Sequence, residues 1–235
     1  MKRWYAGALA IALSGMLFGT AAAEEVAIAA DELTYNGTTD TVDVRGHVVI
    51  TKETATLTGE TGTYALGAGT ASLTGGVAYT DGQRSLTAST LTWDGGRLLT
   101  AEGNVRLRDA DRTLTGAYVR YDTESGYGLV RGSASVQMNE AEMQAGEIEA
   151  YTREIRLIGS GGVYLRQYAD DFVATGDHIV YTQTPGADDG YAVLEGNATA
   201  TQNGNTLRGP RLDIRLQDNV VETKGRSTLI IRTKD

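Results

Sequence analysis

The sequence predicts an all-β protein of about fourteen antiparallel strands, built from seven repeats of about 29 residues. Three observations support this fold class: a unit that recurs along the chain, an alternation of apolar and polar residues within each unit, and a composition of 30 glycines and 2 prolines in 235 residues. Many glycines and few prolines are typical of strands that are joined by tight turns. We therefore expect helix to be nearly absent.

The first half of each unit begins at a small residue that is followed five positions later by an aromatic residue. Aromatic residues make up 7% of the chain, so seven such positions would hold about half of one by chance. Six are filled. The small residues are Ala30, Gly59, Ala88, Gly116, Gly146, Gly176 and Gly209, and the residues five positions later are Tyr35, Tyr64, Trp93, Tyr121, Tyr151, Tyr181 and Ile214.

The apolar residues change strand face at the small residue, because their spacing from it is even on one side and odd on the other. Apolar residues such as Leu57, Leu86 and Leu114 lie two positions before it, whereas Leu91 and Val119 lie three positions after it. One strand face cannot hold both sets unless the strand is irregular between them. The pattern predicts a bulge or corner at each small residue.

The second half of each unit starts at a glycine and continues with alternating residues. The glycines are Gly46, Gly75, Gly103, Gly132, Gly161, Gly196 and Gly225. Two and four residues later stand mostly apolar residues, for example Val48 and Ile50 or Val105 and Leu107, with polar residues between them. This period of two is typical of a strand with one buried face. Two strands per unit follow, joined by short turns.

The units run without a break from about Val26 to the C-terminus, which predicts one domain over residues 24–235 with a continuous core. The insertion around Pro185 to Gly190 is expected to form a longer surface loop. The last unit lacks its aromatic residue and carries Pro210 inside a strand, which predicts an edge strand or an irregular one.

The N-terminus has the features of a signal peptide over residues 1–23. Lys2 and Arg3 supply positive charge, an apolar stretch follows from Ala6 to Phe18, and the alanines at 21–23 offer a cleavage site. The mature chain is then expected in the periplasm. An uncleaved membrane anchor is the alternative interpretation of the same segment.

Composition excludes several functions. The chain has no cysteine, which rules out disulfides, thiolate metal sites and lipid attachment to cysteine. Its formal net charge of −9 becomes −11 without Lys2 and Arg3, and this acidity disfavours binding to nucleic acid.

The residues that could carry chemistry lack the required patterns. His47 and His178 occupy different halves of distant units, so neither a metal site nor a catalytic dyad is expected. Asp188-Asp189-Gly190 lacks the spaced oxygen ligands of a calcium loop. Glu147 and Glu149 lie on one strand face and could support glycosidase chemistry, although repeat proteins commonly carry such charges on solvated faces. The sequence therefore predicts no enzyme and no cofactor.

The repeat as a whole resembles the OstA-like repeat of LptA proteins. The resemblance is carried by Ala30-Asp31-Glu32-Leu33-Thr34-Tyr35 followed by Gly46-His47-Val48-Val49-Ile50, and by Gly103-Asn104-Val105-Arg106-Leu107. It covers nearly the whole mature chain. It implies an elongated, twisted β-jellyroll that carries lipopolysaccharide from the inner to the outer membrane. The implied partners are lipopolysaccharide, an inner-membrane LptC-like jellyroll, an outer-membrane LptD-like jellyroll and further copies of the chain.

We expect lipid A acyl chains to lie against the apolar residues of both halves. Sequence alone leaves open whether each of these residues lines a lumen or packs in a dry core. The candidate lipid-binding residues are Leu33, Tyr35, Val48, Ile50, Tyr64, Val77, Tyr79, Leu91, Trp93, Val105, Leu107, Val119 and Tyr121.

The end strands of such a sheet present unpaired backbone groups, and these are candidate sites for joining partners. We expect the joining segments at Val26 to Tyr35 and at Ser227 to Arg232. Three other interpretations remain open: a membrane-anchored LptC-like component, a structural or adhesin-like β-repeat with a dry core, and an enzyme acting on envelope glycans.

Overall fold

The computed structural model describes residues 26–95, 97–109, 112–138, 141–168, 171–187, 189–216 and 220–232. All regular elements in these ranges are β-strands, as the sequence predicts. The expected signal peptide at 1–23 lies outside them. The strands are β1 (Val26–Ala29), β2 (Glu32–Asn36), β3 (Thr41–Lys52), β4 (Ala55–Ala65), β5 (Thr70–Thr80), β6 (Arg84–Asp94), β7 (Leu98–Asp109), β8 (Arg112–Asp122), β9 (Tyr127–Gln137), β10 (Ala141–Tyr151), β11 (Arg156–Gln167), β12 (Phe172–Thr182), β13 (Tyr191–Gln202), β14 (Asn205–Arg215), β15 (Val220–Lys224) and β16 (Thr228–Ile230).

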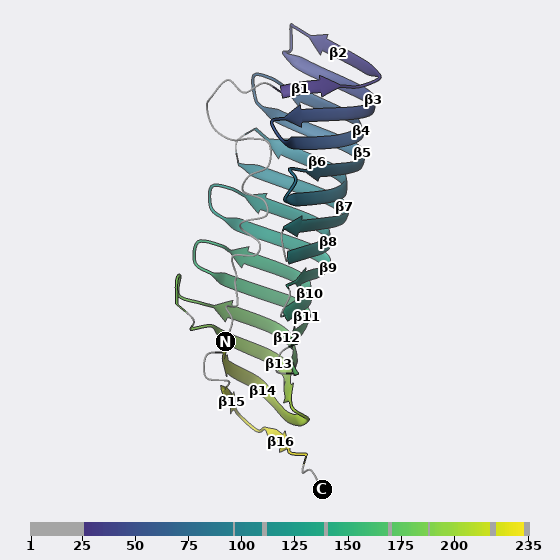
Figure 1. Ribbon diagram of the computed structural model, residues 1–235. Helices are drawn as coiled ribbons and strands as arrows, with labels where there is room; N and C mark the ends of the chain where they lie inside the picture. Colours follow the sequence, from purple (N-terminus) through teal and green to yellow (C-terminus); the bar gives the residue numbers. More distant parts are fainter. Residues whose placement is uncertain are drawn as a thin grey trace.

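The strands form one antiparallel sheet, and from β3 to β15 each strand pairs with the next along the chain. They stack along the long axis of the molecule, from β1–β3 at one end to β14–β16 at the other (Figure 1). At the first end β1 and β2 pair with different parts of β3, and at the last end β15 and β16 pair with different parts of β14. Each of these two pairs is one strand position with an interruption. The sixteen strands thus occupy fourteen positions, and the predicted fold class is confirmed.

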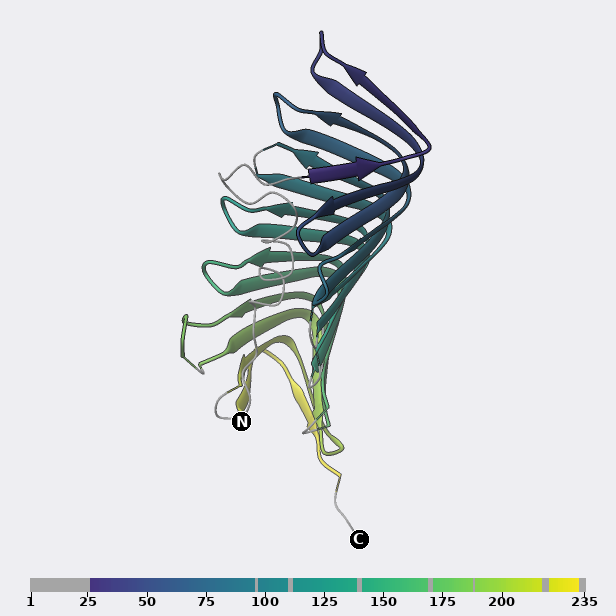
Figure 2. The ribbon, with the colours of Figure 1, turned by 45° about the horizontal axis from the view of Figure 1, so that its top comes forward.

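Each long strand bends near its middle, and the bends give the sheet a V-shaped cross-section (Figure 2). The bend is a β-bulge, seen as a register shift in every pairing from β3–β4 to β13–β14. We call the two sides of the V arm A and arm B. Arm A comprises residues 41–45, 61–65, 70–74, 90–94, 98–102, 118–122, 127–131, 147–151, 156–160, 178–182, 191–195 and 211–215, and arm B comprises residues 48–52, 55–59, 77–80, 84–88, 105–109, 112–116, 134–137, 141–145, 163–167, 172–176, 198–202 and 205–209.

Positive-φ residues build the bulges. All seven glycines that begin the predicted second halves have φ between 73° and 99°. A side chain at most of these glycines would also collide with a neighbouring side chain: a Cβ on Gly103 would lie 2.3 Å from the Ser89 hydroxyl oxygen, and one on Gly132 would lie 2.6 Å from the Ala117 Cβ. Backbone conformation and close approach both favour glycine there.

The core fills the inside of the V. One cluster of buried apolar residues runs from β3 to β14 and draws on both arms. Leu107 of arm B is 1% exposed and Val119 of arm A is 2% exposed. The predicted change of parity is confirmed, because the bulge lets apolar residues on either side of it face inward.

In the fifth unit the small residue at the bend lies one position earlier in the sequence than predicted. Ala145 pairs with Ala134, as Gly59 pairs with Val48, so Ala145 and not Gly146 is the residue at the bend. The inward residue five positions later is the fully buried Ala150, whereas Tyr151 is on the outer face. Gly146 was misassigned because glycine and alanine both satisfy the small position and a tyrosine follows Gly146 at the expected spacing.

Two further predictions concern irregular positions. The described residues between β12 and β13 form no strand, which confirms the loop around Pro185 to Gly190. Pro210 lies at the bulge of β14, where its neighbours pair with β15 on one side and β16 on the other. No helix in the described ranges has the length and apolar character needed to cross a membrane.

Candidate lipid-binding trough

The inner face of the V places most of the predicted lipid-binding residues together. Eleven of the thirteen lie on strands β3 to β8 with their side chains in the core or packed against it. Val48, Val77 and Val105 are at most 1% exposed, while Ile50 and Tyr64 are partly buried. All eleven stand two or four residues after a predicted glycine, or three or five residues after a predicted small residue. Their contact with lipid remains a prediction.

The other two predicted residues, Leu33 and Tyr35, lie on β2 at the edge of the sheet. Their exposed fractions are 50% and 57%. The Tyr35 hydroxyl donates a hydrogen bond of 3.1 Å to the Asp40 carboxylate. The repeat pattern places them at inward positions, but in the described part of the chain β2 has a neighbouring strand, β3, on one side only.

An open pocket with a volume of about 40 Å³ occupies the trough near its N-terminal end. The predicted residues Ile50, Tyr64, Leu91 and Trp93 line it. Its remaining lining residues are Ile28, Val42, Val44, Leu57, Gly62, Thr63, Ala71, Ser72, Leu73 and Thr92.

Sequence reasoning missed Val42, Val44 and Leu73 as site residues. A signal was available, because Val42 and Val44 precede Gly46 by four and two positions, and Leu73 precedes Gly75 by two. Alternation therefore extends to both sides of each glycine. The prediction used only the alternating residues on the C-terminal side of each glycine.

Beyond the pocket, side chains from the two arms fill the trough. Ile148 and Leu194 are fully buried in this part of the sheet. A second, smaller open pocket with a volume of about 10 Å³ lies near the C-terminal end. It is lined by Phe172, Ile214, Leu216 and Val221 together with Gln167, Gln202 and Arg215. Open space is thus found toward both ends of the described sheet, and the Ile148 and Leu194 side chains between these two pockets are buried.

Tyrosine hydroxyls mark the rims of both arms. Tyr79 is 2% exposed, and its hydroxyl donates a hydrogen bond of 3.2 Å to Asp81, which also pairs with Arg84 at 2.6 Å. Burial raises the pKa of Tyr79 to about 12. On arm A the Tyr181 hydroxyl donates to the Gln183 side chain at 2.9 Å. The rings face apolar neighbours and the hydroxyls reach polar groups.

The polar residues that were weighed for chemistry have structural partners. His47 Nδ1 lies 2.7 Å from the Asp31 carboxylate, and this contact raises the pKa of the exposed His47. Glu147 pairs with Arg131 on the outer face of arm A. Within the described ranges no group of three or more His, Asp or Glu side chains is arranged to hold a metal ion.

The two ends of the sheet differ in charge. Residues 26–54 carry five carboxylates and two cations. Residues 205–216 and 220–232 carry six cations and two carboxylates. Exposed apolar side chains occur at both ends, with Val26 at the first end and Leu229, Ile230 and Ile231 at the last.

The fold and the trough define a class of protein: an all-β meander folded into a V with an apolar inner face. The family described as "LptA/(LptD N-terminal domain) LPS transport protein" matches residues 97–220, more than half of the chain. The chain therefore belongs to this family of lipopolysaccharide transport proteins. The resemblance found in the repeat is confirmed.

Two other comparisons add little. A search of the curated proteins finds no match. Among solved structures, the chain is similar to LptH of Pseudomonas aeruginosa, described as the LptA homologous periplasmic component of the lipopolysaccharide transport device. The identity is 14%, the alignment covers 89% of this chain and 96% of that chain, and the TM-score is 0.19. That score is too low to support an argument about shape or ligand.

Proposed function

We propose that this protein is a periplasmic lipopolysaccharide carrier that shields the acyl chains of lipid A on the way from the inner to the outer membrane. The observation that carries the proposal is the apolar pocket that opens the trough between the arms, in a chain that belongs to a lipopolysaccharide transport family. The inner face carries the continuous apolar core, whereas most outward positions are polar.

The energetics of an acyl chain in water favour such a sheath. Each CH₂ group kept from water is worth about 0.8 kcal/mol, so a chain of about a dozen carbons exposed in the periplasm costs about 10 kcal/mol. A trough that remains apolar along its length lowers this cost at every step of the passage.

The V architecture allows the filled middle of the trough to open. Ladder hydrogen bonds join neighbouring strands within each arm, so they run along the trough and not across it. Contacts between the arms are made by apolar side chains such as Leu107 and Val119. If the angle between the arms widened at the bulges, acyl chains would take the place of these contacts. The hydrogen bonds between neighbouring strands would stay intact.

The ends are suited to joining partners by strand pairing. The edge strands β1, β2, β15 and β16 each pair on one side only. The first end is acidic and the last end is basic, which favours a head-to-tail join between copies. An inner-membrane LptC-like jellyroll and an outer-membrane LptD-like jellyroll would use the same two edges.

The test is native mass spectrometry of the protein purified from an envelope-bearing host, together with photo-crosslinking to labelled lipopolysaccharide. A crosslinking amino acid is placed at Trp93, which lines the pocket, and in a control at Arg120, which is exposed on the outer face of arm A. We expect bound glycolipid and a crosslink at Trp93 alone. An apo mass with no crosslink at either position would favour a structural repeat with a dry core.

A further inference from the structure

The outer faces of the two arms differ in their charges. From β6 to β10 the outward positions of arm A include Asp94, Glu102, Asp122, Glu147 and Glu149. The outward positions of arm B from β4 to β9 contain no carboxylate, and their only charges are two arginines. These twelve positions are Thr56, Thr58, Ala78, Thr80, Ser85, Thr87, Arg106, Arg108, Thr113, Thr115, Ser135 and Gln137.

The two arginines are adjacent on one strand face. Arg106 and Arg108 are two residues apart on β7, which places their Cα atoms about 7 Å from each other on the same side of the sheet. Both are exposed, and neither has an ion pair with any residue in the described ranges. Two uncompensated cations side by side are unusual in a chain of net charge −9.

Hydroxyl groups flank both arginines. Arg106 is opposite Thr87 on β6 and Thr115 on β8. Arg108 is opposite Ser85 on β6 and Thr113 on β8. Neighbouring strands lie about 4.8 Å apart, so these hydroxyls are within reach of a group bound between the guanidinium groups. We call the six residues Ser85, Thr87, Arg106, Arg108, Thr113 and Thr115 the arginine–hydroxyl patch.

The donor set of the patch fits a phosphate monoester. A guanidinium group donates two parallel hydrogen bonds to two oxygens of one anion. A carboxylate has only two oxygens, whereas a phosphate monoester has three terminal oxygens and a second negative charge. A second guanidinium and the neighbouring hydroxyls supply the partners that the extra oxygen and charge require.

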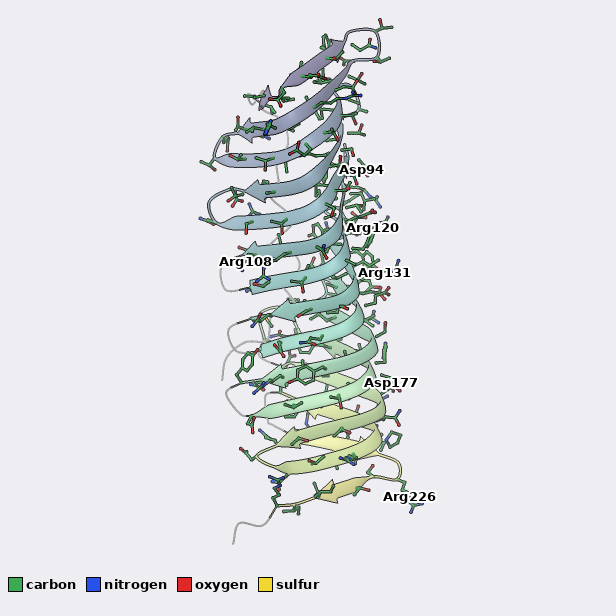
Figure 3. All side chains as sticks on the ribbon, turned by 90° about the vertical axis from the view of Figure 1, so that its right-hand side faces the viewer. Asp94, Arg108, Arg120, Arg131, Asp177 and Arg226 are labelled. Atoms are coloured by element: carbon green, nitrogen blue, oxygen red, sulfur yellow. The ribbon has the colours of Figure 1, made fainter. Side chains whose placement is uncertain are left out.

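We propose that the arginine–hydroxyl patch binds a phosphate group on the head of the lipid that the trough carries, an inference that rests on the proposed function. Arg108 is one residue from the end of β7 and lies near the ends of the strands, away from Arg120 and Arg131 (Figure 3). Leu107, between the two arginines, faces the trough. Arg106 and Arg108 face the opposite side of the sheet from Leu107, so a head group that extends from the trough over the rim of arm B would meet Arg108 first.

The experiment compares binding of lipid A and of enzymatically dephosphorylated lipid A to the full mature chain. We expect the natural chain to bind lipid A about tenfold more tightly, a difference typical of one or two exposed charge-assisted hydrogen bonds. The variant R106Q/R108Q should bind both lipids with the lower affinity. The variant R45Q/R120Q is the control, because it removes two exposed arginines of arm A and leaves the patch intact.

Two results would overturn the inference while leaving the carrier function standing: both lipids bind the natural chain equally well, or R106Q/R108Q keeps the tenfold difference. If neither lipid binds the natural chain, the carrier function fails instead. A titration with inorganic phosphate alone separates the sources of the anion. Tight binding of free phosphate that is lost in R106Q/R108Q, without lipid binding, would identify a site for a soluble phosphate and reject the lipid head.

Discussion

Tyr191 donates a hydrogen bond of 2.7 Å to Asp213, an aspartate that is only 5% exposed although it is on the outer face of arm A. Arg211 contacts the same carboxylate at 2.8 Å, and Lys224 lies 4.0 Å from it. The Arg211 hydrogen bond is the main cause that lowers the pKa of Asp213, and the bond from Tyr191 adds to it against the opposing effect of burial. This cluster joins β13, β14 and β15 at the C-terminal end.

The Asp213 cluster predicts a dependence of stability on pH. Because the pKa of folded Asp213 lies below the ordinary value of 3.8, its contribution is complete above that pH and is lost as the pH falls through the folded pKa. The variant D213N should lose less stability than the natural chain over this acid range. Urea unfolding at several pH values checks this. An equal loss of unfolding free energy with falling pH in the natural chain and in D213N would contradict the prediction.

Gly75 and Gly76 offer a matched pair at one bulge. Gly75 has φ +86° and a Cβ there would lie 2.5 Å from the Glu60 Cβ, whereas Gly76 has φ +67° and open space around it. We expect G75A to be destabilised by more than the conformational cost of about 1–2 kcal/mol. G76N should be nearly neutral, because Asn104 adopts the equivalent conformation with φ +49°. Thermal unfolding of both variants measures the difference, and equal losses would refute the bulge assignment.

Tyr121 and Tyr151 look equivalent in the repeat but lie on opposite faces. Tyr121 is 3% exposed in the core. The Tyr151 ring packs against the Tyr127 ring at a tilt of 59°, with centroids 5.2 Å apart, and the Tyr151 hydroxyl donates a hydrogen bond to Glu149. We expect Y121A to cost about 3–5 kcal/mol and Y151A about 1 kcal/mol. Denaturant unfolding of the two variants decides. A cost for Y151A as large as that for Y121A would restore the original frame.

Removal of residues 226–235 should abolish end-to-end association and spare folding. The deletion removes β16, which pairs with β14 over only three residues, and leaves β15 in place. Residues 233–235 of the deleted segment lie outside the described ranges. Light scattering after gel filtration measures the oligomers, and circular dichroism checks the fold.

The charge difference between the ends supplies a second readout for the same join. Association of the natural chain should weaken as salt rises, because exposed charges are screened over about 8–10 Å at physiological ionic strength. The truncated chain should show no such dependence. If the oligomer distribution is the same with and without residues 226–235, the C-terminal edge is not the joining surface.

The sequence by itself determined the strands, their repeat and the bulges. Local rules decide these features: alternation specifies a strand with one buried face, and a glycine before an alternating segment specifies a positive φ at the bend. Gly103 and Val105 illustrate both, since the first has φ +79° and the second is 1% exposed. The family could also be recognised from the sequence, because the resemblance rests on the residues of the repeated local pattern.

Only the tertiary structure decided the frame of the fifth unit, the place of the open pocket and the exposure of Leu33 and Tyr35. Spacing cannot tell Ala145 from Gly146, because both are small, and pairing with Ala134 settles the matter. Inward position does not ensure burial at an edge, because β2 has a neighbour among the described strands on one side only. The arginine–hydroxyl patch likewise depends on register, since residues as far apart in sequence as Ser85 and Thr113 become neighbours of Arg108 only through the sheet.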